Sequence, residues 1–470
     1  GNTAVGTYAG ASITTGIHNT LVGRAAADAL SDADYNVAVG GYSLSTDTLG
    51  SKSVAVGYGT LNNQNYTTAT DSFNTAVGYT AGLSIVTGRY NSIIGALAGD
   101  AITSNGNVAL GYSALTTETS GGNSTAIGTH ALNTQNVGGG TNVMNTACGY
   151  TAGYAVTSGT RNTFVGAYSG DATDDGANNT AVGAEALSAN CGDHNTVVGN
   201  NAGNLLTSSN NTLIGSRVGD ALTVGELNTA VGDQALTTDD VGSRCVAVGY
   251  YALGAQNAPG STANNYGNTA VGYGSGGGIV EGYYNTFLGY QSGDACTSGT
   301  DNVCVGWDAD TDASNRVGAV SLGSGIGTFA ANNSFRVKGD GGVYNTGNTS
   351  AWNTTSDERI KKNITDSTVG LAEINQIKVR NFEYRTADEI TDSALQAYDK
   401  DQIAVVMSGV QVGCIAQELK AIIPSAVGTD DRGIHTVQSD EINWHMIKAV
   451  QELSAKVTSL EAEVTKLKGE

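Results

Sequence analysis

Proline is almost absent from this chain: two of its 470 residues are Pro, whereas 66 are Gly. Plentiful glycine without proline excludes a collagen-like rod, which needs both residues in a strict triplet period. No run of about 18 apolar residues occurs, so the sequence predicts no transmembrane helix and no membrane insertion. The chain opens inside a repeat at Gly1, and we expect further sequence upstream of it.

Basic residues are also scarce, since 22 Lys and Arg face 43 Asp and Glu and the formal net charge is −21. This balance repels phosphate backbones, so nucleic acid is not an expected partner. The six cysteines show no CxxC or CxxH spacing, and we expect no disulfide framework, no metal site and no cofactor. Cys148 and Cys304 replace the Val or Ala of the repeat, which predicts two small buried hydrophobic residues.

Glycine is distributed unevenly along the chain. Sixty of the 66 Gly precede Ser356, and 13 of the 22 Lys and Arg follow it. A composition change of this size marks a domain boundary. We expect four segments: a repeat shaft over 1–320, a β neck over 321–355, a small α+β domain over 356–440 and a coiled-coil helix over 441–470.

The repeat unit is N-T-A-V-G followed by a polar half. Its glycine recurs 18 times between Gly6 and Gly306, in steps of 16 or 17 residues except for three longer ones. A unit of this length is too short for a helix–turn–helix and fits one coil of a β-solenoid. The sequence therefore predicts a mainly β fold, a β-solenoid or β-roll shaft of about 18 short coils.

The two residues before each repeat glycine are apolar in all 18 units. Because a strand alternates its faces, both faces of this short strand need covering. One face would fill the coil, and the other needs the return strand of the coil or another chain. The polar half of each unit supplies few apolar residues, so we infer that chains associate along the shaft. Asn opens 15 of the 18 units, which favours a ladder of stacked amides over a metal ladder.

A longer period is superimposed on the repeat of 16 or 17 residues. Coils with a G-D-A or A-D-A signature carry a bulky residue in place of the usual Ala, and they recur about every four coils: Leu21, Ile93, Phe164, Leu213 and Phe287. This pattern predicts duplicated four-coil blocks. Three insertions (58–73, 129–144 and 250–267) should then project on one side. Their polar loops suit contacts with sugars or serve only as spacers.

After Ser356 the pattern changes to mixed secondary structure. Helices are predicted over 369–377 and 416–423, and strands over 380–385 and 409–414. Ser439 and Asp440 are expected to cap a long final helix whose seam alternates in steps of four and three: Met446, Val450, Leu453, Val457, Leu460, Val464 and Leu467. Val at heptad position a and Leu at heptad position d favour a two-stranded coiled coil. The repeat favours association of three chains, and we predict a homotrimer.

Two resemblances extend this interpretation. The repeats resemble trimeric adhesin heads and phage tail-fibre shafts. S-D-E-R-I-K-K-N-I, N-F-E-Y-R and G-C-I-A-Q-E-L-K-A-I-I-P-S-A-V, followed by a coiled coil, resemble the intramolecular chaperone of phage endosialidases and tail fibres, the peptidase S74 family. The resemblance implies a trimeric folding clamp, a single-turnover autoprotease that cuts itself off. It implies that the bond between Thr355 and Ser356 is cleaved, with Ser356 as the nucleophile and Lys361 as the general base. Asp357, Arg359 and Asn363 also match the motif.

The implied Ser–Lys dyad has two physical requirements. Lysine acts as a base only when neutral, which burial or neighbouring cations such as Arg359 and Lys362 favour. Five residues on a helix turn through about 500°, so Ser356 and Lys361 must meet in a turn or across chains. An uncleaved motif that serves as a permanent trimerisation cap stays open as the alternative.

These observations predict a phage tail-fibre segment that is assembled in the host cytoplasm, lies in the virion and mediates host attachment. The expected partners are two further copies, other virion tail proteins and a host cell-surface glycan or protein receptor. A bacterial trimeric surface adhesin is one alternative, but it would need a membrane anchor where this sequence predicts a coiled coil. A polysaccharide-degrading tailspike needs paired carboxylates, and Glu is nearly absent from the shaft, although Asp could replace it. No enzyme activity is inferred for the shaft.

Overall fold

The computed structural model describes residues 1–138, 142–257, 264–311, 314–324, 335–337, 359, 361–392, 395, 409–429 and 433–469. The chain divides into two compact units, Gly1–Lys338 and Gly339–Glu470, and each is described by itself. Thr355, Ser356 and Asp357 of the predicted cleavage motif lie outside the described residues. No helix among the described residues is long and apolar enough to cross a membrane.

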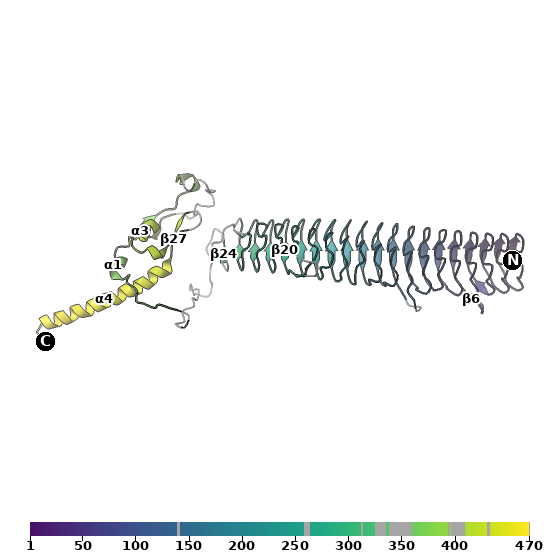
Figure 1. Cartoon of the computed structure of the whole chain (residues 1–470), viewed down its shortest axis with the longest axis horizontal. Helices are drawn as coiled ribbons and strands as arrows, with labels where there is room; N and C mark the ends of the chain where they lie inside the picture. Colours follow the sequence, from purple (N-terminus) through teal and green to yellow (C-terminus); the bar gives the residue numbers. More distant parts are fainter. Residues whose placement is uncertain are drawn as a thin grey trace. The chain divides into compact units, whose positions relative to one another are not determined.

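The first unit is a β-solenoid with one short strand of a continuous sheet in each coil (Figure 1). The sheet has 20 strands, and each pairs in parallel with the strand of the next coil, so that Phe164 lies opposite Ala181. Eighteen strands end just before the repeat glycines, and β23 and β24 extend the sheet beyond them. The predicted mainly β solenoid of about 18 coils is confirmed.

Every strand of this sheet is three residues long: β1 Thr3–Val5, β2 Thr20–Val22, β3 Val37–Val39, β5 Val54–Val56, β7 Thr75–Val77, β8 Ser92–Ile94, β9 Val108–Leu110, β10 Thr125–Ile127, β11 Thr146–Cys148, β12 Thr163–Val165, β13 Thr180–Val182, β14 Thr196–Val198, β15 Thr212–Ile214, β16 Thr229–Val231, β18 Val246–Val248, β20 Thr269–Val271, β21 Thr286–Leu288, β22 Val303–Val305, β23 Val320–Leu322 and β24 Phe335–Val337. Two-residue strands pair beside two insertions, β4 Gly50–Ser51 with β6 Thr70–Asp71 and β17 Gly242–Ser243 with β19 Asn264–Asn265. β6 projects from the edge of the stack (Figure 1).

The predicted asparagine ladder is confirmed. The backbone N–H of Asn36 donates to Asn19 Oδ1 at 2.9 Å, and the Asn19 carboxamide donates to the Ala33 carbonyl at 2.7 Å. The same pair of bonds recurs at later coils, for example where Asn179 N–H donates to Asn162 Oδ1 at 2.9 Å. Each buried amide therefore joins two coils and satisfies backbone groups that the solenoid removes from water.

The bulky residues of the four-coil period fit beside glycines. Phe164 is fully buried, and a Cβ added to Gly153 would lie 2.9 Å from its ring. Phe287 stands in the same relation to Gly276 at 2.8 Å. Such large-to-small matching makes neighbouring coils unequal, so a slip by one coil would create overlaps and cavities. Only a shift by a whole block of coils would preserve this fit.

The ladder is repaired where it is interrupted. Ser53, which replaces an Asn, precedes the first insertion, and Gln64 takes over the missing contacts. Gln64 Nε2 donates to Ser53 Oγ at 2.9 Å and to the buried Asp47 Oδ2 at 2.6 Å, and Asn74 donates to Gln64 Oε1 at 2.8 Å. Burial raises the pKa of Asp47, and hydrogen bonds from Gln64 and Gly50 oppose this rise. Equivalent networks support the other insertions through Glu118 with Gln135 and Asp239 with Gln256.

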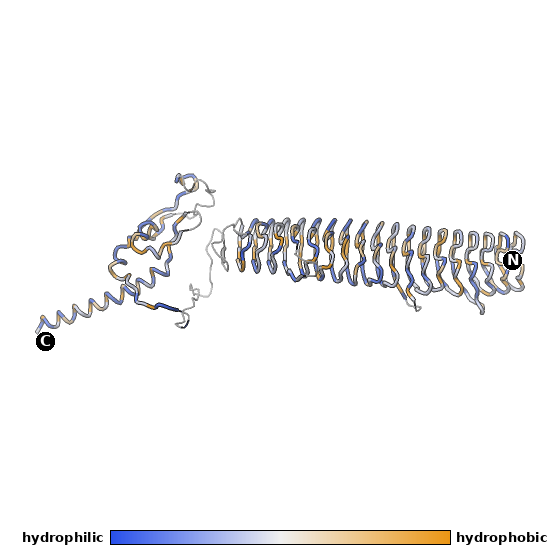
Figure 2. Tube along the Cα trace, viewed as in Figure 1, coloured by the Kyte–Doolittle hydropathy of each residue, from blue (hydrophilic) through white to orange (hydrophobic). Residues whose placement is uncertain are grey.

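The outward face of the strands is not covered within one chain. From β2 to β23 the central residues of the three-residue strands are buried, whereas Ile94 and Leu288, each before a repeat glycine, keep 43% and 48% of their surface exposed. Hydrophobic residues recur in every coil of the solenoid (Figure 2), and in other coils, such as that of Val39, the residue before the glycine is half-buried. Cys304 is buried as predicted, but Cys148 is exposed, and that prediction was wrong. Cys148 directly precedes a repeat glycine, so its side chain is on the outward face.

A pair of carboxyl groups near the end of the solenoid predicts a pH dependence. Burial, and then a hydrogen bond with Asp294, raise the pKa of Asp310 to about 8. Because the folded-state pKa exceeds the unfolded one, this contribution to stability is complete below about pH 4 and is lost as the pH rises through about 8. We expect the unfolding midpoint of the wild type to fall between about pH 5 and pH 9 more than that of Asp310→Asn. Parallel pH profiles of the two proteins would contradict this assignment.

The second unit is a small α+β module. Its described elements are α1 Leu371–Ile374, β25 Arg380–Phe382, η2 Ala387–Glu389, β26 Gln411–Gly413, α3 Ala416–Lys420, η3 Pro424–Ala426, β27 Val427–Thr429, β28 His435–Val437 and α4 Ser439–Leu467. β25 pairs with β26 and β27 with β28, both antiparallel. The four predicted elements and the final helix are present. The N-cap of α4 is Gln438, however, and Ser439 and Asp440 lie in the first turn of the helix.

Candidate functional site

The described part of the cleavage motif lies at the surface. Arg359, Lys361 and Asn363 are all exposed, and Asn363 has a left-handed backbone with φ 57°. A left-handed Asn is typical of a tight turn. Because the predicted Ser356 lies outside the described residues, the structure neither brings Ser356 and Lys361 together nor separates them. Their pairing stays a prediction.

The segment that follows the motif is tied to the final helix. Glu452 of α4 accepts the backbone N–H of Leu371 at 2.9 Å, which satisfies a free N–H at the start of α1. A Cβ on Gly370 would come within 2.6 Å of Glu452 Oε2, so a side chain there would displace the Glu452 carboxylate. Ser367 Oγ lies 3.3 Å from His445 Nδ1, also on α4. The chain between Asn363 and α1 is therefore held against α4.

A hydrophobic core holds the rest of the module to the start of α4. Leu419, Ile423 and Ala426 are buried and pack with partly buried residues that include Ile374 of α1 and Ile442 of α4. Ser425 Oγ donates to Glu441 Oε2 at 2.7 Å beside this core. The hydrogen-bonded ion pair with Arg380, 2.7 Å from Arg380 Nη2 to Glu418 Oε1, lowers the pKa of Glu418. α4 is thus anchored to the module through residues of its N-terminal half.

One face of α4, from Met446 to Leu467, exposes an apolar seam. Val450 and Leu460 keep 64% and 59% of their surface exposed, and hydrophobic and polar residues alternate along the helix (Figure 2). The other predicted seam residues are also exposed: Met446, Leu453, Val457, Val464 and Leu467. A seam in heptad spacing with no cover in its own chain is the surface that a coiled-coil partner buries.

Sequence reasoning missed the contacts that Glu452 and His445 make with the segment behind the motif. Glu452 lies 81 residues from Leu371, and nothing in the local pattern distinguishes it from the other acidic residues of α4. Among the described residues, no group of three or more His, Cys, Asp and Glu could hold a metal ion.

A solenoid shaft followed by a small module with an exposed heptad helix has the organisation of a fibre- or tailspike-like protein. Residues 356–428 match the Peptidase_S74 family, described as the chaperone of endosialidase. The chain therefore carries a C-terminal segment of this family behind its β-solenoid, and the resemblance seen in the sequence is confirmed. No curated protein matches the chain.

Proposed function

We propose that this chain is a segment of a homotrimeric phage tail fibre whose C-terminal chaperone directs assembly and then releases itself. The observation that carries the proposal is the uncovered heptad seam of α4, the helix that follows the segment matched to the chaperone family. In this function the shaft reaches a host cell surface, and other virion tail proteins hold its far end.

The outward strand face supplies a second surface for association. None of the three-residue strands from β1 to β23 carries a charged residue, although the chain has a net charge of −21. Copies of one acidic chain repel each other wherever their charges approach. They can approach along this charge-free face, where half-exposed Val, Ile and Leu side chains gain from burial. Three copies in register would cover the face that one chain leaves open.

The proposed cleavage balances with water as the only co-reactant. Ser356 Oγ attacks the Thr355 carbonyl carbon while the neutral Lys361 amine accepts the hydroxyl proton. The Ser356 nitrogen leaves and takes up a proton, so that an ester joins Thr355 to Ser356 Oγ. Water then hydrolyses this ester to a free carboxyl on Thr355 and a free Ser356. Lys361 is exposed in one chain, and burial between chains would favour its neutral form.

Contacts behind the motif link this chemistry to assembly. Glu452 and His445 hold the segment after Asn363 from the same helix that presents the seam. Docking of three α4 helices would therefore fix the motif in each chain. Cleavage would then report a completed trimer.

A denaturing gel together with intact-mass analysis of freshly expressed protein tests this function. We expect the wild type to yield a fragment of residues 356–470, and Ser356→Ala and Lys361→Ala to remain whole. Lys378→Ala removes an exposed lysine outside the motif and should be cut like the wild type. An uncut wild type would contradict self-release and make the module a permanent trimerisation cap.

A further inference from the structure

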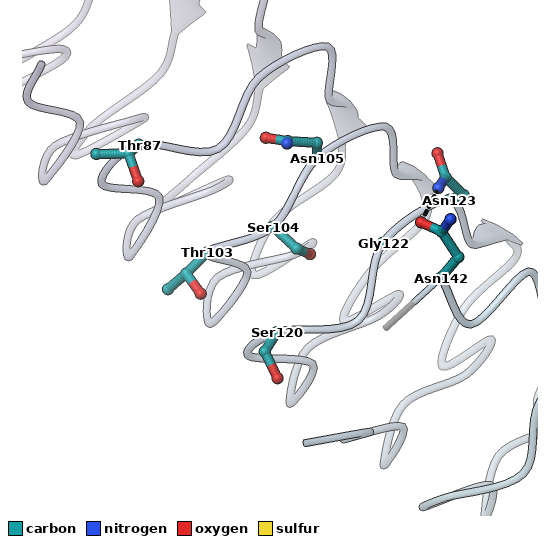
Figure 3. Close-up of a pocket in the computed structure, with 8 residues that line it drawn as sticks. All are labelled: Thr87, Thr103, Ser104, Asn105, Ser120, Gly122, Asn123 and Asn142. Carbon is teal, nitrogen blue, oxygen red and sulfur yellow. Dashed lines mark hydrogen bonds between the residues drawn. The ribbon is translucent and has the colours of Figure 1, made fainter. Parts of the chain in front are cut away.

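A polar groove crosses four coils of the solenoid next to the second insertion (Figure 3). It has a volume of about 440 Å³ and is lined by Thr87, Thr103, Ser104, Asn105, Ser120, Gly122, Asn123 and Asn142. These residues come from the turns before the strands and not from the strands themselves. None of them is charged, on a chain with a net charge of −21.

Internal hydrogen bonds hold the groove side chains in place. Asn105 Oδ1 accepts the backbone N–H of Arg89 at 2.8 Å, and Asn123 Nδ2 donates to Asn142 Oδ1 at 2.7 Å (Figure 3). Ser120 Oγ donates to the Val137 carbonyl at 3.0 Å. Among the described residues, these bonds use the oxygens of Asn105 and Asn142 and leave their carboxamide N–H groups as donors for a ligand. The Ser120 oxygen can still accept.

An exposed aromatic stack ends beside the groove. Tyr90 follows Thr87 by three residues and is 54% exposed. It stacks on Phe73 with ring centroids 5.8 Å apart, and the Arg89 guanidinium lies over its ring, 5.3 Å from the centroid. The equivalent residue of the next coil is Gly106, which has no side chain to continue the stack. A Cβ at Gly106 would lie 2.5 Å from Asn123 Oδ1, so a side chain there would displace the Asn123 carboxamide.

We propose that this groove binds a neutral oligosaccharide. Sugar hydroxyls donate and accept at once, and the fixed amides and hydroxyls of the groove supply both partners. The apolar face of a sugar ring can pack on the exposed part of the Tyr90 ring, beside the Arg89 guanidinium. An anionic ligand would call for Arg or Lys in the groove, and a protein partner for apolar anchors. The biological role of the groove rests on the proposed attachment function. Its geometry depends neither on cleavage nor on α4.

Asn105→Asp tests the groove with little effect on the fold. The equivalent residues Asp34 and Asp193 already accept the corresponding backbone N–H groups, at 2.8 and 2.7 Å. The substitution therefore keeps the turn while it replaces the amide donor by a negative charge. We expect binding of the oligosaccharide to weaken about tenfold or more. Tyr90→Ala should weaken binding to a similar extent. Tyr284→Ala is the matched control, because Tyr284 has the equivalent place and a left-handed backbone in a coil far from the groove.

The experiment uses the full chain with Ser356→Ala, probed with an array of neutral and anionic oligosaccharides and by titration of those retained. The proposal expects neutral oligosaccharides to bind, with affinity reduced in Asn105→Asp and Tyr90→Ala and unchanged in Tyr284→Ala. It is overturned if no neutral oligosaccharide binds below about 10 mM, if only anionic ones bind, or if Asn105→Asp binds like the parent protein. The cleavage assay is independent, so failure of the groove and failure of the proposed chaperone function are distinguishable.

Discussion

Replacing Gly166 by alanine is expected to lower the free energy of unfolding of the solenoid by roughly 3 kcal/mol or more. Gly166 has φ +135°, a conformation that residues with a Cβ rarely adopt. Its Cβ would also overlap the backbone carbonyl of Gly183 in the next coil. Both strands are held by coils on either side, so neither can withdraw. Chemical unfolding followed by circular dichroism measures the loss.

Ala167→Tyr is the control for this substitution. Tyr150 occupies the equivalent position one coil earlier, directly after its repeat glycine. A change of less than about 0.5 kcal/mol is therefore expected from the much larger side chain. If Gly166→Ala unfolded at the same denaturant concentration as the wild type, the recurrence of glycine at this position would have no steric cause.

Leu460→Asp is expected to abolish assembly. Leu460 is 59% exposed in one chain, so the substitution leaves the fold of the monomer unchanged. In a three-helix seam it would place three carboxylates together, and the desolvation penalty alone is several kcal/mol per ion. We expect native mass spectrometry to show single chains, and self-cleavage to be lost together with the trimer.

Ser459→Asp adds the same charge to the same helix beside the seam. Ser459 is exposed and outside the heptad positions, so this variant should assemble and cleave like the wild type. Loss of assembly in both variants would indicate a general effect of charge on α4. Assembly of Leu460→Asp would show that the seam does not join the chains.

The period of the sequence predicted most of the shaft. Asn19 and Asn36 recur with the repeat glycines, and stacking of equal coils then determines the ladder. The repairs at the insertions were not predictable. Ser53 showed that the ladder is interrupted, but Gln64 lies 11 residues away and reaches Ser53 only because the coil closes. The error at Cys148 has a simpler cause, since a shift by one residue reverses the face of a strand.

The functional residues divide in the same way. The motif around Lys361 is contiguous and was recognised from the sequence, whereas Glu452 acts from a distant helix. Asn105 and Asn142 of the groove come from different coils and resemble dozens of other polar residues. Gly106 and Gly122 beside them were a weak signal, because a Cβ at either position would lie within 3 Å of an oxygen of the neighbouring coil.

The native mass of freshly purified protein carrying Ser356→Ala tests the central claim of a self-assembling trimer most directly. The substitution keeps every chain whole, so the trimer should have three times the chain mass of 47.5 kDa. A mass of 47.5 kDa, that of a single chain, would contradict the trimer. The seam of α4 and the charge-free strand face would then need another explanation.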